Sequence, residues 1–148
     1  MLRALTSIAL ALSLCSRCAE ARLWETRDQV DARYGKALRA EPDGDFTVYT
    51  YAFLDFQILV TYLDGKSQSE LYYHPDNRQL SSRDRDLILS LNASSGSWRT
   101  FEEVLVLIQP SGGHPIAVGR YEPDAHPPIL GVCTAEFEKK KSASVLKK

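Results

Sequence analysis

Three histidines are the first side chains to consider for chemistry, because imidazole binds metal ions and transfers protons near neutral pH. They are His74, His114 and His126. Metal-binding histidines on one helix or strand usually lie a few residues apart, which brings both rings to one ion. These three are widely separated and lie beside prolines. The spacing predicts surface histidines in loops, with no metal site and no cofactor.

Carboxylates are the next candidates, because a general acid–base pair can converge from distant parts of a chain. Glu102 and Glu103 are adjacent, so on a strand they would point to opposite faces and would not form a pair. Asp55 and Asp64 are candidates without a distinctive motif. The sequence has no G-x-S-x-G elbow, and Gly112-Gly113 lacks the Lys and Ser/Thr of a phosphate loop. We therefore assign no catalytic residue.

Tyrosines give the strongest binding signal, because they combine an apolar ring with a hydroxyl that hydrogen-bonds. Five lie on a predicted three-strand sheet. On an open sheet face they would form a platform for a protein or a glycan, and otherwise they pack beneath helices with their hydroxyls at the rim. The candidate binding residues are Tyr49, Tyr51, Tyr62, Tyr72 and Tyr73.

Cys133 has the apolar neighbours Ile129, Leu130 and Val132. A reactive cysteine needs a nearby histidine, a positive charge or a helix N-terminus to lower its pKa. The surroundings of Cys133 favour a buried, unreactive thiol instead.

Two capping boxes predict where helices begin. Thr26-Arg27-Asp28-Gln29 predicts a helix over about 26–34, which Gly35 ends. Ser81-Ser82-Arg83-Asp84 predicts a second helix over about 82–92, with Leu87, Ile88 and Leu91 facing the core.

Strand patterns follow each of these helices. Alternating aromatic and β-branched residues predict strands at 46–53, 56–63 and 68–73, the last two joined by an Asp64-Gly65 hairpin. Glu41-Pro42-Asp43-Gly44-Asp45 before them predicts a turn and loop. Three further strands are expected at 104–108, 116–121 and 129–133, before a short helix around Phe137.

The expected order is therefore α-βββ-α-βββ-α, an α+β fold with an antiparallel sheet and short helices packed on one face. The recurrence of a capped helix before a three-strand cluster is also compatible with an internal duplication. The predicted domains are a signal peptide at 1–21, one α+β domain at 22–138 and a basic, flexible tail at 139–148.

The first 21 residues have the three parts of a secretory signal peptide. Met1-Leu2-Arg3 is a positive start, the run at 4–14 is uncharged and apolar, and Ala19-Glu20-Ala21 predicts cleavage before Arg22. The apolar run is too short for a membrane-spanning helix. Leu14 before Cys15 and Arg17 before Cys18 fit a lipoprotein cleavage site badly. We expect an exported protein, periplasmic or extracellular, with no transmembrane helix in its mature form.

Charge divides unevenly along the chain. Residues 22–138 carry a clear excess of Asp and Glu, which argues against nucleic-acid binding. The tail is basic, and it could make weak contact with an anionic surface through Lys139, Lys140 and Lys141, although such a run is usually a solvated, mobile end.

The stretch T-R-D-Q-V-D-A-R-Y-G at 26–35, followed by Tyr/Phe-rich strands and an Asp-Gly hairpin, resembles small exported bacterial proteins of unassigned function. It is also similar to the SmpA/OmlA outer-membrane assembly lipoproteins, in which a t-x-x-q-V…G helix precedes a strand hairpin. Lys36-Ala37 replaces the proline that often follows the glycine, and no convincing lipobox is present. The resemblance covers about a third of the mature chain. It implies an envelope protein that works by contact, and it transfers no functional residues.

These observations predict an exported, non-enzymatic binding or scaffolding module of the cell envelope that contacts a protein or a glycan. The alternative from another class is a small envelope hydrolase whose carboxylates converge only in the fold. A third reading, a secreted inhibitor of another organism's enzyme, rests on size and fold class alone.

Overall fold

A computed structural model describes residues 23–93, 96–101, 104–108 and 115–145. The expected signal peptide, Cys15, Cys18, Glu102, Glu103, the Gly112-Gly113 pair, His114 and the last two lysines lie outside these ranges. Within the described residues, no helix is both long and apolar enough to cross a membrane.

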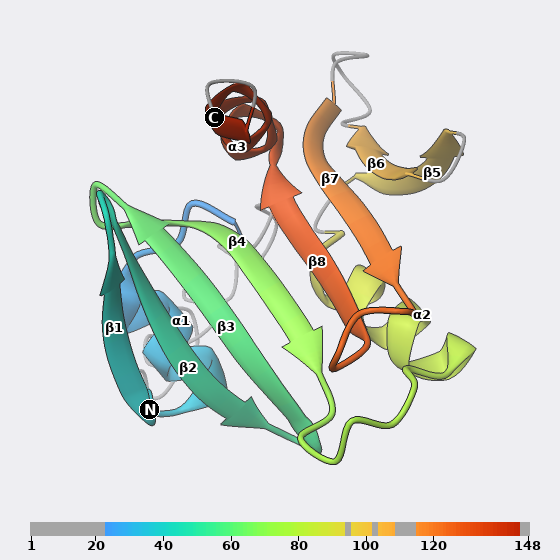
Figure 1. Ribbon diagram of the computed structural model, residues 1–148, viewed down its shortest axis with the longest axis horizontal. Coiled ribbons are helices and arrows are strands. Elements are labelled where there is room, and N and C mark those ends of the chain that lie inside the picture. Colours follow the sequence, from blue (N-terminus) through green and yellow to red (C-terminus); the bar gives the residue numbers. More distant parts are fainter. Residues whose placement is uncertain (1–22, 94–95, 102–103, 109–114, 146–148) are drawn as a thin grey trace, which may run out of the picture.

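The chain forms one antiparallel sheet of eight strands in the order β1-β2-β3-β4-β8-β7-β6-β5, with three helices (Figure 1). The α+β class is confirmed. The elements are α1 (Arg27–Tyr34), β1 (Arg39–Asp43), β2 (Phe46–Phe53), β3 (Phe56–Leu63), β4 (Lys66–Tyr73), α2 (Ser82–Leu91), β5 (Ser97–Phe101), β6 (Val104–Ile108), β7 (Pro115–Glu122), β8 (Ile129–Thr134) and α3 (Ala135–Val145).

The order of the strands divides the chain into two halves of the same design. Each half is a helix followed by a four-strand meander, and the two meanders join where β4 pairs with β8. At this junction Gly131 lies opposite Leu71, and a Cβ on Gly131 would come within 2.8 Å of the Leu71 side chain. The close approach explains why glycine is suited to this position.

Two strands were not expected. Residues 41–45 were predicted to be a turn and loop. Gly44 and Asp45 do form a turn, but Arg39–Asp43 pairs with β2 as β1. Pro42 is tolerated because β1 is at the edge of the sheet, where one side of the backbone needs no partner. The other new strand, β5, is the opposite edge of the described sheet, where it pairs with β6.

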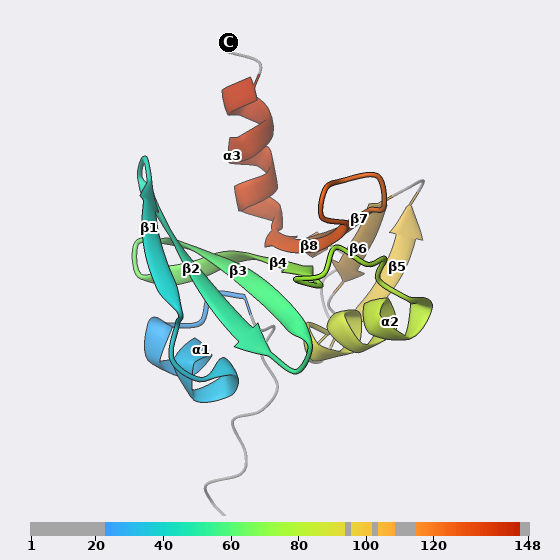
Figure 2. The same cartoon turned by 60° about the horizontal axis from the view of Figure 1, so that its bottom comes forward.

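The first two helices cover one face of the sheet, and α3 rises on the other side (Figure 2). The core lies beneath α1 and α2 and includes Val30, Tyr51, Ile58, Ile88 and Leu130, all fully buried. Helix α3 meets the sheet through Phe137, which packs against Phe46, and through an ion pair of Glu138 with Arg120. The expectation that all helices share one face therefore holds for α1 and α2 only.

Local signals set the ends of the helices as expected. Both capping boxes are present: the Thr26 amide donates to Gln29 Oε1 at 2.8 Å, and the Asp84 amide donates to Ser81 Oγ at 3.2 Å. Helix α3 continues to Val145, so Lys139, Lys140 and Lys141 are helical and the predicted domain boundary at 138 falls within a helix.

Candidate functional site

The buried Glu70 is the centre of a polar cluster beneath α1. Its Oε1 accepts a bond from Arg33 Nη2 at 2.7 Å, and its Oε2 accepts bonds from the hydroxyls of Tyr34, at 2.8 Å, and Tyr72. Asn92, which follows α2, donates from Nδ2 to the Tyr72 hydroxyl at 3.0 Å. The cluster thus links α1 and the end of α2 to strand β4.

Electrostatics favour fixed protonation states in this cluster. Burial, with the Glu70 charge next, raises the pKa of both Tyr34 and Tyr72 well above the usual range. The Arg33 guanidinium also pairs with Glu25 at 2.7 Å, and these carboxylates raise its pKa despite desolvation. Since Glu70 is 0% exposed, a substrate from solvent has no direct path to its carboxylate. The arrangement stabilises the docking of α1.

Most of the predicted tyrosine platform lies under α1 and not on an open face. Tyr51, Tyr62 and Tyr72 are buried, and Tyr49 is half-buried against Tyr62 with the Arg27 guanidinium 4.1 Å above its ring. Tyr73 faces the other side of the sheet because it follows Tyr72, and its hydroxyl donates to Gln57. Sequence analysis offered the alternative that the tyrosines pack beneath helices, and this alternative describes the arrangement. A binding role for the five tyrosines stays a prediction.

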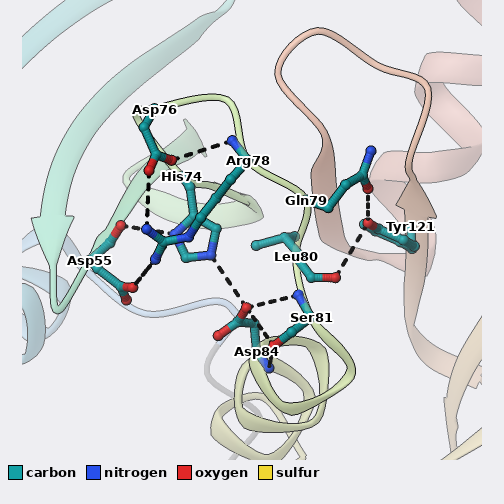
Figure 3. Close-up of polar contacts among 9 residues, drawn as sticks. All are labelled: Asp55, His74, Asp76, Arg78, Gln79, Leu80, Ser81, Asp84 and Tyr121. Carbon is teal, nitrogen blue, oxygen red and sulfur yellow. Dashed lines mark hydrogen bonds and ion pairs between the residues drawn. The ribbon is translucent and has the colours of Figure 1, made fainter.

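A second polar cluster surrounds His74 at the end of β4 (Figure 3). The expectation of a surface histidine is wrong here, because His74 is 0% exposed and its ring stacks on Phe56 with 4.8 Å between centroids. Its Nδ1 lies 3.1 Å from the backbone oxygen of Asp55, and its Nε2 lies 3.3 Å from Asp84 Oδ2. His74 thus joins the turn between β2 and β3 to the first turn of α2.

The rim of this cluster is formed by charged side chains. Arg78 pairs with Asp55 and with Asp76, while Asp84 Oδ2 accepts bonds from the amide and hydroxyl of Ser81 at 2.8 and 2.7 Å. Desolvation alone would raise the pKa of Asp84, but its hydrogen bonds with Ser81 and His74 outweigh that effect and lower it. Asp84 is therefore a capping carboxylate.

Alternation along β4 could have revealed both clusters. Glu70, Tyr72 and His74 are two residues apart, so they project from the same face of the strand. Tyr72 was already a candidate for burial, and the same parity places a carboxylate and an imidazole beside it. Their partners could not be predicted in this way, because Arg33 and Asp84 come from distant elements.

Other candidates remain apart from these clusters. His126 is exposed, and among the described residues no group of His, Cys, Asp and Glu is arranged to hold a metal ion. Asp64 is exposed in the hairpin between β3 and β4.

Burial and the nearby Glu138 raise the pKa of Cys133 to about 12, so its thiol stays protonated at neutral pH. Lys139, Lys140 and Lys141 are exposed on α3.

The Asn92-Ala93-Ser94 sequence has the form of a glycosylation site, but Asn92 is 2% exposed. Its Nδ2, the atom to which a glycan would be attached, donates to Ile88 O as well as to Tyr72. The folded chain therefore does not offer this site for modification.

The turn between β2 and β3 has a feature that sequence reasoning missed. Phe53 pairs with Phe56, so Leu54 and Asp55 form a two-residue hairpin loop. Leu54 has φ 54° while its side chain is 70% exposed. A positive φ at the first central position is typical of a type II′ turn, in which glycine is the usual residue. We call Leu54 and Asp55 the β2–β3 tip.

Comparisons with known proteins show similarity in structure only. No protein-family model matches this chain, and no curated protein matches it. A structural match is a cysteine-rich secretory protein from Staphylococcus aureus subsp. aureus Mu50, with 8% sequence identity and a TM-score of 0.46. It covers 80% of this chain and 47% of that one, so this chain spans about half the length of the matched protein. A likeness at this level carries no argument about function.

Proposed function

We propose that this chain is an exported contact module of the cell envelope that binds a partner protein through the β2–β3 tip. The observation that carries the proposal is Leu54, a large apolar side chain that is 70% exposed and held at φ 54°. A left-handed backbone costs a residue with a Cβ roughly 1–2 kcal/mol, and such strain concentrates at functional positions. Exposure and strain both disfavour leucine for folding alone.

Contact with a protein fits this tip better than contact with a glycan. An aliphatic side chain on a hairpin turn can enter an apolar pocket of a protein. Glycans are usually recognised by aromatic rings, but Tyr51, Tyr62 and Tyr72 are buried beneath α1. The hydrolase alternative has less support, because Glu70 is buried and Asp84 serves as a helix cap. Export rests on the signal-peptide pattern of residues 1–21.

Leu54→Gly tests the proposal, since it removes the exposed side chain and relieves the strained backbone together. We expect the free energy of unfolding to rise by about 0.5–1 kcal/mol, while capture of the partner is lost. The measurement is urea unfolding, together with quantitative cross-linking of the tagged full chain in the envelope of its native host.

Asp64→Gly is the matched control. Asp64 has φ 52° in the hairpin between β3 and β4, so this variant also replaces a left-handed residue by glycine, at the other end of the same strand. Because Asp tolerates this conformation better than Leu, we expect a smaller gain in stability, and we expect the partner captured by the wild type to be retained. A partner retained by Leu54→Gly would show that the tip is not the contact site. The intact mass of the captured protein would show whether the chain begins at Arg22.

A further inference from the structure

Both ring nitrogens of His74 lie against oxygen atoms that can only accept hydrogen bonds. Nδ1 is 3.1 Å from the carbonyl oxygen of Asp55, and Nε2 is 3.3 Å from Asp84 Oδ2. A neutral imidazole has one N–H and one lone pair. Either neutral tautomer would therefore place a nitrogen lone pair against an oxygen lone pair, on a ring that is itself 0% exposed.

A proton on Asp84 would not resolve this conflict. Asp84 Oδ2 already accepts bonds from the amide and the hydroxyl of Ser81 at 2.8 and 2.7 Å. The hydrogen bonds that lower the pKa of Asp84 keep it ionised at neutral pH, against the effect of desolvation. The second proton therefore belongs on the imidazole.

The surrounding charges favour a cation at His74. Asp55 faces it from the turn between β2 and β3, with Oδ2 3.8 Å from Nδ1, and Asp84 faces it from α2. On the loop after β4, the positive charge of Arg78 is already shared between Asp55 and Asp76. Phe56 from β3 stacks on the ring and is uncharged. Without a charge on His74 the cluster would contain three carboxylates and one cation.

We propose that His74 is an imidazolium that positions the β2–β3 tip and makes partner binding sensitive to pH. One N–H holds the carbonyl of Asp55, the residue that follows Leu54, and the other holds the first turn of α2 (Figure 3). Loss of one proton would remove one of these two bonds and release the tip from α2. This regulatory role rests on the proposed function, but the charge state of His74 does not.

The charge state is measured directly on the wild-type full chain by ¹⁵N NMR of the histidine rings at a pH of about 8. We expect the His74 nitrogens to show the imidazolium pattern, with both nitrogens protonated. A neutral-tautomer pattern for His74 at this pH would overturn the proposal. Neither outcome depends on a partner or on a variant that must fold.

Regulation is tested by capturing the partner at a series of pH values. For the wild type we expect capture to fall about tenfold as His74 loses its proton, the order expected for a lost charge-assisted hydrogen bond. His74→Gln keeps a donor but cannot titrate, so its capture should be independent of pH over the same range. If His74→Gln and the wild type have the same pH profile, the regulatory role is wrong.

The two hypotheses fail in different ways. If Leu54→Gly still captures the partner, the contact site is wrong even when NMR shows an imidazolium. If NMR shows a neutral ring while Leu54→Gly loses the partner, the contact site stands and the role of His74 is wrong.

Discussion

Glu70 is a carboxylate in the core whose charge is balanced by one guanidinium and two hydroxyls. Breaking a buried ion pair from one side is strongly destabilising, and here it would leave Arg33 paired with Glu25 alone. We expect Glu70→Gln, which keeps the side-chain size, to lower the free energy of unfolding by about 3 kcal/mol, as measured by urea denaturation.

Tyr62→Phe is the corresponding control in the same part of the core. The Tyr62 hydroxyl is buried and has no hydrogen-bond partner within the described residues. Its removal should leave stability unchanged or raise it by about 1 kcal/mol, because the cost of burying an unpaired polar group is removed. A loss as large as that of Glu70→Gln would show that this hydroxyl contributes a bond to the folded state.

Individual positions differ in how much of their role the sequence shows. Alternation places Tyr72 on the inner face, and the same rule applies to Glu70 and His74. The strain at Leu54 was not predictable, because a Leu-Asp pair is not a standard hairpin turn. The predicted strands at 46–53 and 56–63 imply a reversal at Leu54 and Asp55, but they do not show that Leu54 takes a positive φ there.

Helix α2 depends on a cap that also serves the His74 cluster. The Ser81 hydroxyl donates to Asp84 Oδ2 and accepts from the Asp84 amide. Ser81→Ala should cost about 1 kcal/mol of stability, the usual value for a lost N-cap, measured by thermal or urea unfolding. Ser82→Ala is a fair control, because Ser82 is exposed and follows the cap. Equal losses in the two variants would contradict a capping role for Ser81.

Helices α1 and α2 and six strands follow from the sequence, since caps, alternation and turn residues are local signals. Strand β1 does not, because Pro42 and its charged neighbours suit both a loop and an edge strand. What decides between them is the exposed backbone of β2, which offers hydrogen bonds to residues 39–43. Such a partner is a property of the assembled sheet.

At the scale of the whole molecule, several buried acidic groups hold their protons unusually tightly. Burial, followed by the hydrogen bond to Asp31, raises the pKa of Tyr51 to about 12. Burial also raises the pKa of Cys133 to about 12, and those of Tyr34, Tyr62 and Tyr72 well above normal. The unfolded chain releases these protons at lower pH than the folded chain does.

Below pH about 9 these groups should therefore leave the free energy of unfolding unchanged. As the pH rises towards about 12, they should lower it. The measurement is urea unfolding at a series of alkaline pH values, with tyrosinate absorbance followed in parallel. Tyrosinate should appear together with unfolding. Ionisation of most tyrosines in a chain that remains folded would contradict the burial described for Tyr34, Tyr51, Tyr62 and Tyr72.

The arrangement of the two meanders was beyond sequence reasoning. Neighbouring strands along the chain pair by short turns, which local signals reveal. The pairing of β4 with β8 joins Ser69–Tyr72 to Leu130–Cys133, and no turn specifies it. Only the fit of complete half-sheets selects this junction, as the contact between Gly131 and Leu71 illustrates.

That junction also sets an order of events for folding. The first meander is formed from contacts close in sequence, which form quickly, whereas β4 must wait for a strand about 60 residues later. During synthesis, the growing chain therefore exposes an unpaired β4 edge until residue 133 is available. Such an edge invites pairing with other chains, so we expect the period before β8 arrives to be when this protein is most prone to aggregate.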